Sequence, residues 1–196
     1  EELSAEGSIS FKSVRSVPES MIALFRQQRL LPEDQDKIVV CKAIASRKSV
    51  HIDTPYLHIR AGAVVGSTAG PLNLAAVGIN NHGGCIIGDG VRIQCKGFLK
   101  NRENVQGGRS VAPSVISRNG PIEVEAHEIL NMGSLGMYED GNPGHSPDVQ
   151  LAAKRDFVNQ GLVFGKTIEL KVKQIFTNKG PIVSKNGLRM EAERYT

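Results

Sequence analysis

The stretch Gly84-Cys-Ile-Ile-Gly-Asp-Gly-Val-Arg-Ile-Gln-Cys-Lys-Gly-Phe-Leu-Lys-Asn101 decides the fold, because its character returns in Gly161-Leu-Val-Phe-Gly-Lys-Thr-Ile-Glu-Leu-Lys-Val-Lys-Gln-Ile-Phe-Thr-Asn178. The two stretches lie 77 positions apart, and glycine, asparagine and apolar residues occupy matching places in both. A shorter spacing gives the unit, since Asn159-Gln-Gly161 recurs as Asn178-Lys-Gly180 after 19 residues, and 77 is close to four times 19. A period of about 20 residues indicates a solenoid of stacked repeats.

Within each unit the apolar residues recur at every second position, which is the period of a strand. In Ile168-Glu-Leu-Lys-Val-Lys173 the apolar residues can face a core while the charged residues face water. So short a unit cannot bury its own apolar face, but stacked coils pair each strand with its copies about 4.8 Å away. We therefore predict an all-β fold, a right-handed single-stranded parallel β-helix with rungs of ~19 residues that spans 1–196 as a single domain.

Recurring glycine and asparagine residues are expected at the corners of the coils. Gly88, Gly165 and Gly180 suit corners with positive φ. For Asn101 and Asn178 two interpretations stay open. Each asparagine adopts a left-handed corner conformation, or the amides stack on one another as a ladder.

The segment Phe157-Val-Asn-Gln-Gly-Leu-Val-Phe-Gly-Lys-Thr-Ile-Glu-Leu-Lys-Val172 resembles the haemagglutinin repeats of filamentous-haemagglutinin-type bacterial exoproteins. The likeness lies in spacing and residue class and is clearest over 157–192. It implies a β-helix segment of a large protein exported by two-partner secretion, a class that includes adhesins and toxin carriers. The chain has no Asn-Pro-Asn motif of the family's secretion domain, so an interior segment with further rungs on either side is expected. The implied location is secreted or at the bacterial cell surface.

Composition narrows the functional classes. The net charge of +4, from 24 basic and 20 acidic residues, is too small to indicate a nucleic-acid-binding protein. No apolar run is long enough to span a membrane. Cys85 and Cys95 match Leu162 and Val172 in the repeat, so they are expected as buried thiols, with a disulfide as the alternative. The cysteine and histidine spacing matches no zinc site, and no cofactor is predicted.

Three segments break the repeat. Over 18–31, between Pro18 and Pro32, an inserted helix is predicted, either covering the coil or binding a partner protein. The segment 102–118 is expected to form one irregular rung, with 110–117 along a side. A loop insertion is predicted at about 134–156, because the strands that begin at Ile122 and Ile168 are two rungs plus about eight residues apart.

Two groups of side chains are candidates for ligand contact, and each has a plain structural alternative. In the loop, an aromatic ring to stack on a sugar and groups to hold hydroxyls or a divalent ion come from Tyr138, Glu139, Asp140, His145 and Asp148. The alternative is a solvated acidic loop. In the last rungs, a basic stripe suited to sulfated glycans comes from Lys171, Lys173, Lys185 and Arg189. The alternative there is a solubilising face.

Catalysis is not expected. The best candidates, Glu123 and Glu125, lie on the same side of one strand about 7 Å apart, but an exposed polar face explains them better. The sequence thus favours a structural and adhesive module that contacts a host cell or neighbouring cell, with a sulfated glycan as one ligand. The alternatives are a carbohydrate-active β-helix enzyme that uses these glutamates, and an intracellular effector or toxin fragment whose helix at 18–31 binds a host protein.

Overall fold

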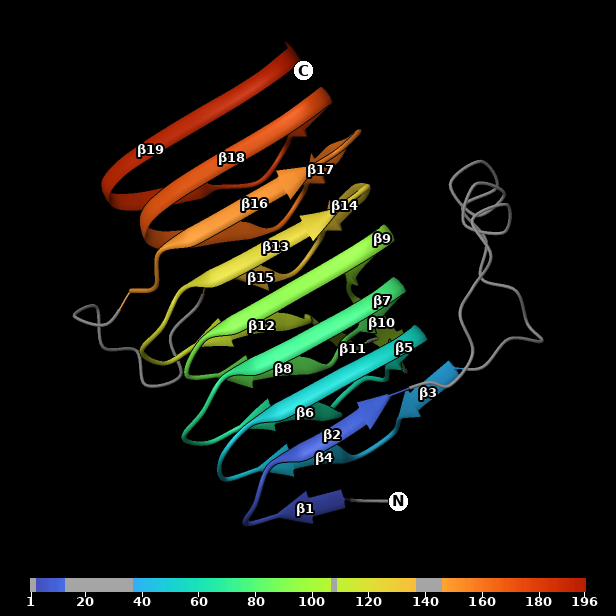
Figure 1. Ribbon diagram of the computed structural model, residues 1–196. Coiled ribbons are helices and arrows are strands. Elements are labelled where there is room, and N and C mark those ends of the chain that lie inside the picture. Colours follow the sequence, from blue (N-terminus) through green and yellow to red (C-terminus); the bar gives the residue numbers. More distant parts are fainter. Residues whose placement is uncertain (1–2, 13–36, 107–108, 137–145) are drawn as a thin grey trace.

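The computed structural model describes residues 3–12, 37–106, 109–136 and 146–196. These residues form nineteen strands and no helix, so the all-β prediction is confirmed for the described part of the chain. Seventeen strands belong to one sheet, which rises from the N-terminal to the C-terminal end in Figure 1. The helix predicted over 18–31 lies outside the described residues.

Parallel pairing organises the large sheet into three ladders. Ladder A joins β1 (Leu3–Ala5), β4 (Ala43–Ser46), β6 (Val64–Ser67), β8 (Cys85–Gly88), β12 (Ser114–Ser117), β15 (Ser134–Leu135), β18 (Leu162–Asn178) and β19 (Ile182–Tyr195). Ladder B joins β2 (Ile9–Lys12), β5 (Val50–Ile59), β7 (Leu72–His82), β9 (Val91–Arg102), β13 (Ile122–Ala126), β16 (Val149–Ala153), β18 and β19. Ladder C joins β3 (Lys37–Val40), β5, β7, β9, β14 (Glu128–Asn131), β17 (Phe157–Asn159), β18 and β19.

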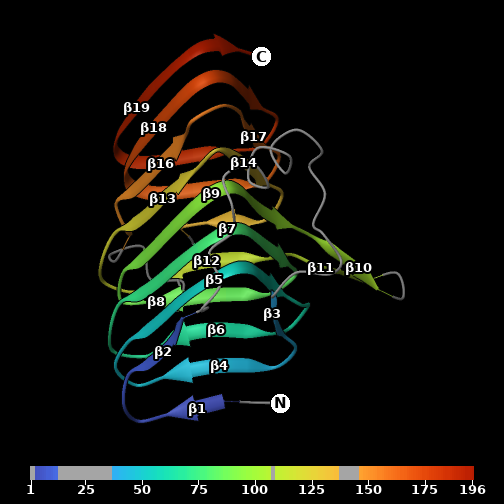
Figure 2. The ribbon, with the colours of Figure 1, turned by 45° about the vertical axis from the view of Figure 1, so that its right-hand side comes forward.

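The pairing register confirms the alignment predicted from the sequence. Val91, Ile122, Val149 and Ile168 lie in line on ladder B. The steps along this line are 31, 27 and 19 residues, so the regular unit is the last one and the first two carry insertions. The first insertion holds an antiparallel hairpin of β10 (Asn104–Gln106) and β11 (Arg109–Val111), which projects from the stack in Figure 2.

Two predicted boundaries need correction. Residues 110–117 do not run together along a side, because 110–111 belong to the hairpin and only β12 joins a ladder. The loop predicted over 134–156 was too wide, because β15 and β16 lie inside that range. The reason is the same in both cases. Unpaired turn residues interrupt the repeat only locally, and the chain returns to the register of the coil below.

The core consists of the apolar residues that alternate inward along the ladders. Ile168 and Leu170 are 1% exposed and Val172 is 5% exposed, while Glu169 and Lys171 face outward, as the alternation predicted. Each buried Val, Leu or Ile side chain contributes about 1.5–3 kcal/mol through its removal from water. Ladder C adds an aromatic stack in which the rings of Phe157 and Phe176 lie 5.1 Å apart. These buried residues form one core cluster that extends along the paired strands of the ladders.

Of the two interpretations of the asparagines, the structure shows the amide ladder. Asn81, Asn101, Asn131, Asn159 and Asn178 stack in line on ladder C. Each Nδ2 donates to the Oδ1 of the next coil, over 2.9 Å for the first pair and 2.8 Å for the other three. Asn101, Asn131 and Asn159 are 0% exposed. The chain of bonds thus satisfies amides that would otherwise be costly to bury.

The positive φ expected at the corner glycines was wrong for all three. Positive φ occurs among the described glycines at Gly62, Gly83 and Gly136. Close backbone approach explains the glycines at 88, 165 and 180 instead. A Cβ at Gly165 would lie 2.9 Å from the carbonyl oxygen of Pro147, and one at Gly180 would collide with the carbonyl oxygen of Gly161. A stacked coil leaves no room for a side chain at these positions.

Candidate functional site

The two glutamates considered for catalysis lie on the outer face of ladder B, and each is held by a cation. Glu123 pairs with Arg92 of the adjacent strand, with an Nη2–Oε2 distance of 2.5 Å. Glu125 pairs with Lys154, with an Nζ–Oε1 distance of 2.7 Å. Their arrangement therefore favours structural ion pairs between coils over a pair of catalytic carboxylates.

The residues proposed as a basic stripe are brought together with acids. Glu169 lies opposite Arg189 in the register, and Lys171 lies opposite Glu191. The Lys171 ammonium is 2.9 Å from Glu169, and its hydrogen bond lowers the pKa of that carboxyl. The charges at these two paired positions thus have opposite signs on the two strands, so Arg189 and Lys171 do not form a continuous positive row there.

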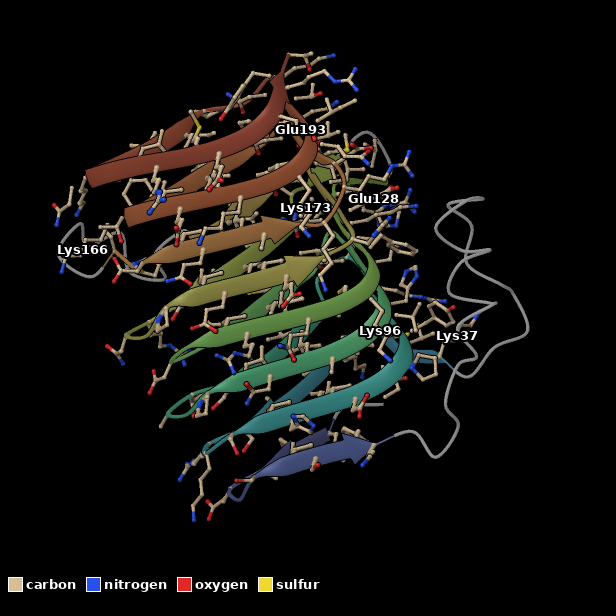
Figure 3. All side chains as sticks on the ribbon, turned by 45° about the horizontal axis from the view of Figure 1, so that its top comes forward. Lys37, Lys96, Glu128, Lys166, Lys173 and Glu193 are labelled. Carbon is tan, nitrogen blue, oxygen red and sulfur yellow. The ribbon has the colours of Figure 1, made fainter. Side chains whose placement is uncertain are left out.

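The two remaining cations of that group have different positions. Lys173 projects outward from β18 in Figure 3 and is exposed. Lys185 is an exposed residue of β19. A contact of either side chain with a ligand stays a prediction.

Most of the loop candidates lie outside the described residues, namely Tyr138, Glu139, Asp140 and His145. Asp148 is described, and it serves the fold. Its Oδ1 accepts hydrogen bonds from the backbone N–H of Thr167 at 3.3 Å and from the Thr167 hydroxyl at 2.5 Å. Asp148 therefore ties the start of β16 to the next coil, and a ligand-contact role for it stays a prediction.

A groove on the outer face of ladder C offers the best described place for a ligand. It has a volume of about 410 Å³ and runs across four successive coils, from β9 over β14 and β17 to β18. Its apolar surface comes from outward-facing residues that include Leu130, Val158 and Ile175. The outer faces of the other strands carry mainly charged side chains, so apolar side chains on this outer face are unusual. The groove is therefore both concave and apolar at its floor, as ligand-binding sites commonly are.

Polar groups lie along one side of this groove. Glu128 and Asp156 occupy equivalent positions in adjacent coils and line the groove, and Arg155 lies between them. The Nη1 of Arg155 is 2.9 Å from Glu128 Oε1, and its Nε is 3.3 Å from Asp156 Oδ2. The second oxygen, Oδ1 of Asp156, is buried without a hydrogen-bond partner in the described structure. A buried carboxylate oxygen with no donor marks a place that a ligand hydroxyl or ammonium group can complete.

The other end of the groove carries a cation next to an aromatic ring. The Lys100 ammonium lies 4.6 Å from the ring centroid of Phe98, and both residues line the groove. Glu128, of the adjacent strand β14, also lines the groove and lies on the right-hand side of the stack in Figure 3. The groove can therefore take a ligand that has one apolar face and several hydroxyl or charged groups along its length.

Sequence reasoning missed this groove although a signal was present. The outward positions considered in the sequence were the charged ones, and outward apolar positions were not compared between coils. Applied to outward positions, the same register places Leu130, Val158 and Thr177 in one column. Two apolar residues in succession on an outer column indicate a covered or ligand-facing surface.

The thiols differ in environment. Cys95 is buried, as predicted, and its burial raises the pKa of the thiol. Cys85 is only half-buried, so full burial was wrong for this thiol, and Cys41 is exposed; none of the three forms a disulfide in the structure. A redox role would therefore fall to Cys41, the accessible thiol.

No group of three or more His, Cys, Asp or Glu side chains within the described ranges is placed to hold a metal ion. The part of the chain that the structure describes has no helix of the length and apolarity needed to cross a membrane.

Comparison with known proteins gave no relative. Neither the models of protein families, nor the curated proteins, nor the solved structures contain a significant match to this chain. The haemagglutinin-like character of its repeats therefore stays a resemblance that was noted from the sequence.

Proposed function

We propose that this chain is a right-handed parallel β-helix module with a structural and adhesive role, part of a large secreted or surface-exposed bacterial exoprotein of the haemagglutinin type. Three ladders of parallel strands, each linking one turn of the chain to the next, support the solenoid. So does the line of stacked amides from Asn81 to Asn178. The haemagglutinin-type repeat supports the class of exoprotein. In such a protein the neighbours of this module are further rungs of the same chain.

The adhesive role rests on the groove over ladder C. A rigid stack of coils holds outward side chains at fixed spacing, which suits recognition of an extended ligand with repeated groups. An oligosaccharide fits the chemistry, because a sugar ring has an apolar face for Leu130 and Val158 and hydroxyls for Glu128 and Asp156. The single observation that carries this proposal is the buried Oδ1 of Asp156, which faces no donor of the described protein.

The test compares glycan binding by matched variants. We expect the wild-type chain to bind members of a glycan array and Asp156→Asn to lose that binding, since the amide halves the acceptor capacity and weakens the pairing with Arg155. Glu125→Gln is the control, because it removes the same charge from an ion pair on ladder B, outside the groove. A second variant, Val158→Arg, fills the apolar floor with an outward side chain.

Each result decides one part of the proposal. Loss of binding in Asp156→Asn and Val158→Arg, with binding kept in Glu125→Gln, supports the groove. Binding that survives both variants but disappears on deletion of 137–145 removes the groove from the proposal and assigns adhesion to the loop. A folded wild-type chain that binds no glycan overturns the adhesive role.

A further inference from the structure

A group of basic side chains lies on the outer face of ladder C, mainly on strands that precede the groove. Lys37 belongs to β3, His58 to β5, His82 to β7 and Arg102 to β9, and Arg60 follows β5 directly. His82 lies opposite Arg102 in the register, and Arg60 follows Ile59, which pairs with Asn81. We call these five residues the basic cluster. Lys37 marks its position at the right of Figure 3.

The basic cluster differs from every other charged surface described above because it lacks internal compensation. On ladder B, cations and carboxylates alternate across the coils. In the basic cluster, none of the cations forms an ion pair with an acid of the described residues. Glu103, which follows Arg102 in the chain, accepts a hydrogen bond at its Oε2 from the hydroxyl of Ser110 on the β10–β11 hairpin, at 2.8 Å. Like charges on nearby strands cost stability, so a bound anion would stabilise a group of this kind.

The lowered pKa values of the two histidines reflect the nearby positive charges. Their rings lie 6.3 Å apart at an interplanar angle of 74°. Burial lowers the pKa of His58, and so do the nearby charges of His82, Arg60, Arg102 and Lys37. Burial and Arg102 likewise lower the pKa of His82, while its hydrogen bond to the backbone of Glu103 acts in the opposite direction. An anion bound among these side chains would reverse the effect of the positive charges.

Unpartnered polar atoms at the same place provide an independent observation. The Nε of Arg102 is buried and has no hydrogen-bond acceptor in the described structure. Asn80 lies between His58 and Lys100 in the register and is 4% exposed, and its Oδ1 also has no partner. Since the two ends of a side-chain amide can exchange by rotation, Asn80 can present its N–H groups to an acceptor there. A buried guanidinium N–H without an acceptor is costly, and a bound oxyanion would satisfy it.

We propose that the basic cluster binds a tetrahedral oxyanion of the phosphate or sulfate type, held by Arg60 and Arg102 with Lys37, His58 and His82 around it. Guanidinium groups match the geometry of such an anion because they donate two parallel hydrogen bonds. Arg60 and Arg102 lie one coil on either side of His82, so their backbones are about 10 Å apart, and an anion held by both arginines would lie over His82. This site is separate from the glycan-binding role proposed above and does not depend on it.

The experiment uses the full chain and follows the side-chain signals of His58, His82 and Arg102 by NMR. Inorganic phosphate and inorganic sulfate are titrated at constant ionic strength with chloride as the balancing ion. We expect saturable shifts of the ring signals, an upward shift of the pKa of both histidines and a shift of the Arg102 Nε–H signal. A sulfated monosaccharide and its unsulfated form are then compared, which distinguishes a free ion from an ester as the source of the group.

Two variants test the assignment. Arg102→Gln and Arg60→Gln each remove one charge-assisted donor, and each is expected to weaken phosphate binding by about tenfold or more. Arg189→Gln removes the same charge at the far end of the stack and is expected to bind like wild type. Circular dichroism checks that each variant is folded, and Arg60 is exposed, so its replacement leaves the core intact. Folded Arg60→Gln and Arg102→Gln that keep wild-type affinity, or a wild-type chain whose signals shift no more with phosphate than with chloride, would overturn the proposal.

Discussion

Replacement of Asn131 by alanine tests whether the amide ladder holds the coils together. Asn131 is 0% exposed and sits in the middle of the ladder. Its Oδ1 accepts from Asn101 Nδ2, and its Nδ2 donates to Asn159 Oδ1, both at 2.8 Å. The same Nδ2 also lies 3.3 Å from the carbonyl oxygen of Leu162. Alanine removes all of these bonds at once.

The expected cost follows from the groups left behind. Asn159 Oδ1 loses its donor, and Asn101 Nδ2 keeps only a long contact of 3.4 Å with the carbonyl oxygen of Ser134. A buried polar group without a partner costs about 1–3 kcal/mol, so two such groups lower the free energy of unfolding by roughly 2–6 kcal/mol. No new packing compensates, since alanine also leaves a small void.

Asn178→Ala is the matched control. It removes one bond of the same ladder, the 2.8 Å bond from Asn159 Nδ2, but Asn178 is exposed and water can replace its amide. We expect a loss of at most about 1 kcal/mol. Equilibrium unfolding in urea, followed by circular dichroism, measures both variants, and an unchanged slope with denaturant shows that the folded states have the same compactness. Equal losses in Asn131→Ala and Asn178→Ala would refute the view that burial makes the ladder essential.

Three further outcomes are expected. Gly161→Ala should destabilise the chain strongly, because the new Cβ would collide with the carbonyl oxygen of Gly133, whereas a Cβ at Gly187 has nothing within 4 Å and Gly187→Ala should be tolerated. Thermal unfolding compares the two variants, and equal melting temperatures would contradict the role of close backbone approach. The exposed thiol of Cys41 should react with a thiol reagent in the native state, while Cys95, which is buried and has a raised pKa, should react only after unfolding; rapid native labelling of Cys95 in a mass-spectrometric assay would disprove its burial. Folding lowers the pKa of His58 from about 6.5, so the unfolded state binds more protons than the folded state at a pH near and below 6.5, and the free energy of unfolding should decrease as the pH falls through 6.5. A His58→Gln variant whose melting temperature has the same pH dependence as that of the wild type would refute His58 as the cause.

The sequence was sufficient for the strand class and the coil register, because both depend on a period that any stack must keep. The offset of 77 residues between the two matching stretches reappears in the pairing of Val91 through to Ile168 and in the ladder from Asn101 to Asn178. The choice between a positive-φ corner and an amide ladder for Asn101 needed the structure, since both use asparagine at a regular spacing.

The sites were harder to predict because they depend on outward columns across several coils. His58-Ile-Arg60, Asn80-Asn-His82 and Lys100-Asn-Arg102 align one coil apart, and that alignment already places three basic residues, at 60, 82 and 102, in one column. Local inspection of each segment shows only scattered charges. A repeat with unequal insertions hides such columns until the register of every coil is known.

The register also explains why these surface charges carry functional meaning. In a parallel stack, side chains at equivalent positions of neighbouring strands lie about 4.8 Å apart, so like charges in one outward column repel and opposite charges attract. On ladder B, opposite charges lie side by side, as in Arg92 beside Glu123 and Glu169 beside Arg189. On ladder C, the column of Arg60, His82 and Arg102 contains only basic residues, although a single acidic substitution in any of these coils would relieve the repulsion. Opposite charges are paired across the coils on ladder B, whereas the basic residues of this column on ladder C have no acid of the described residues beside them. We attribute this difference to an external anion that supplies the negative charge there.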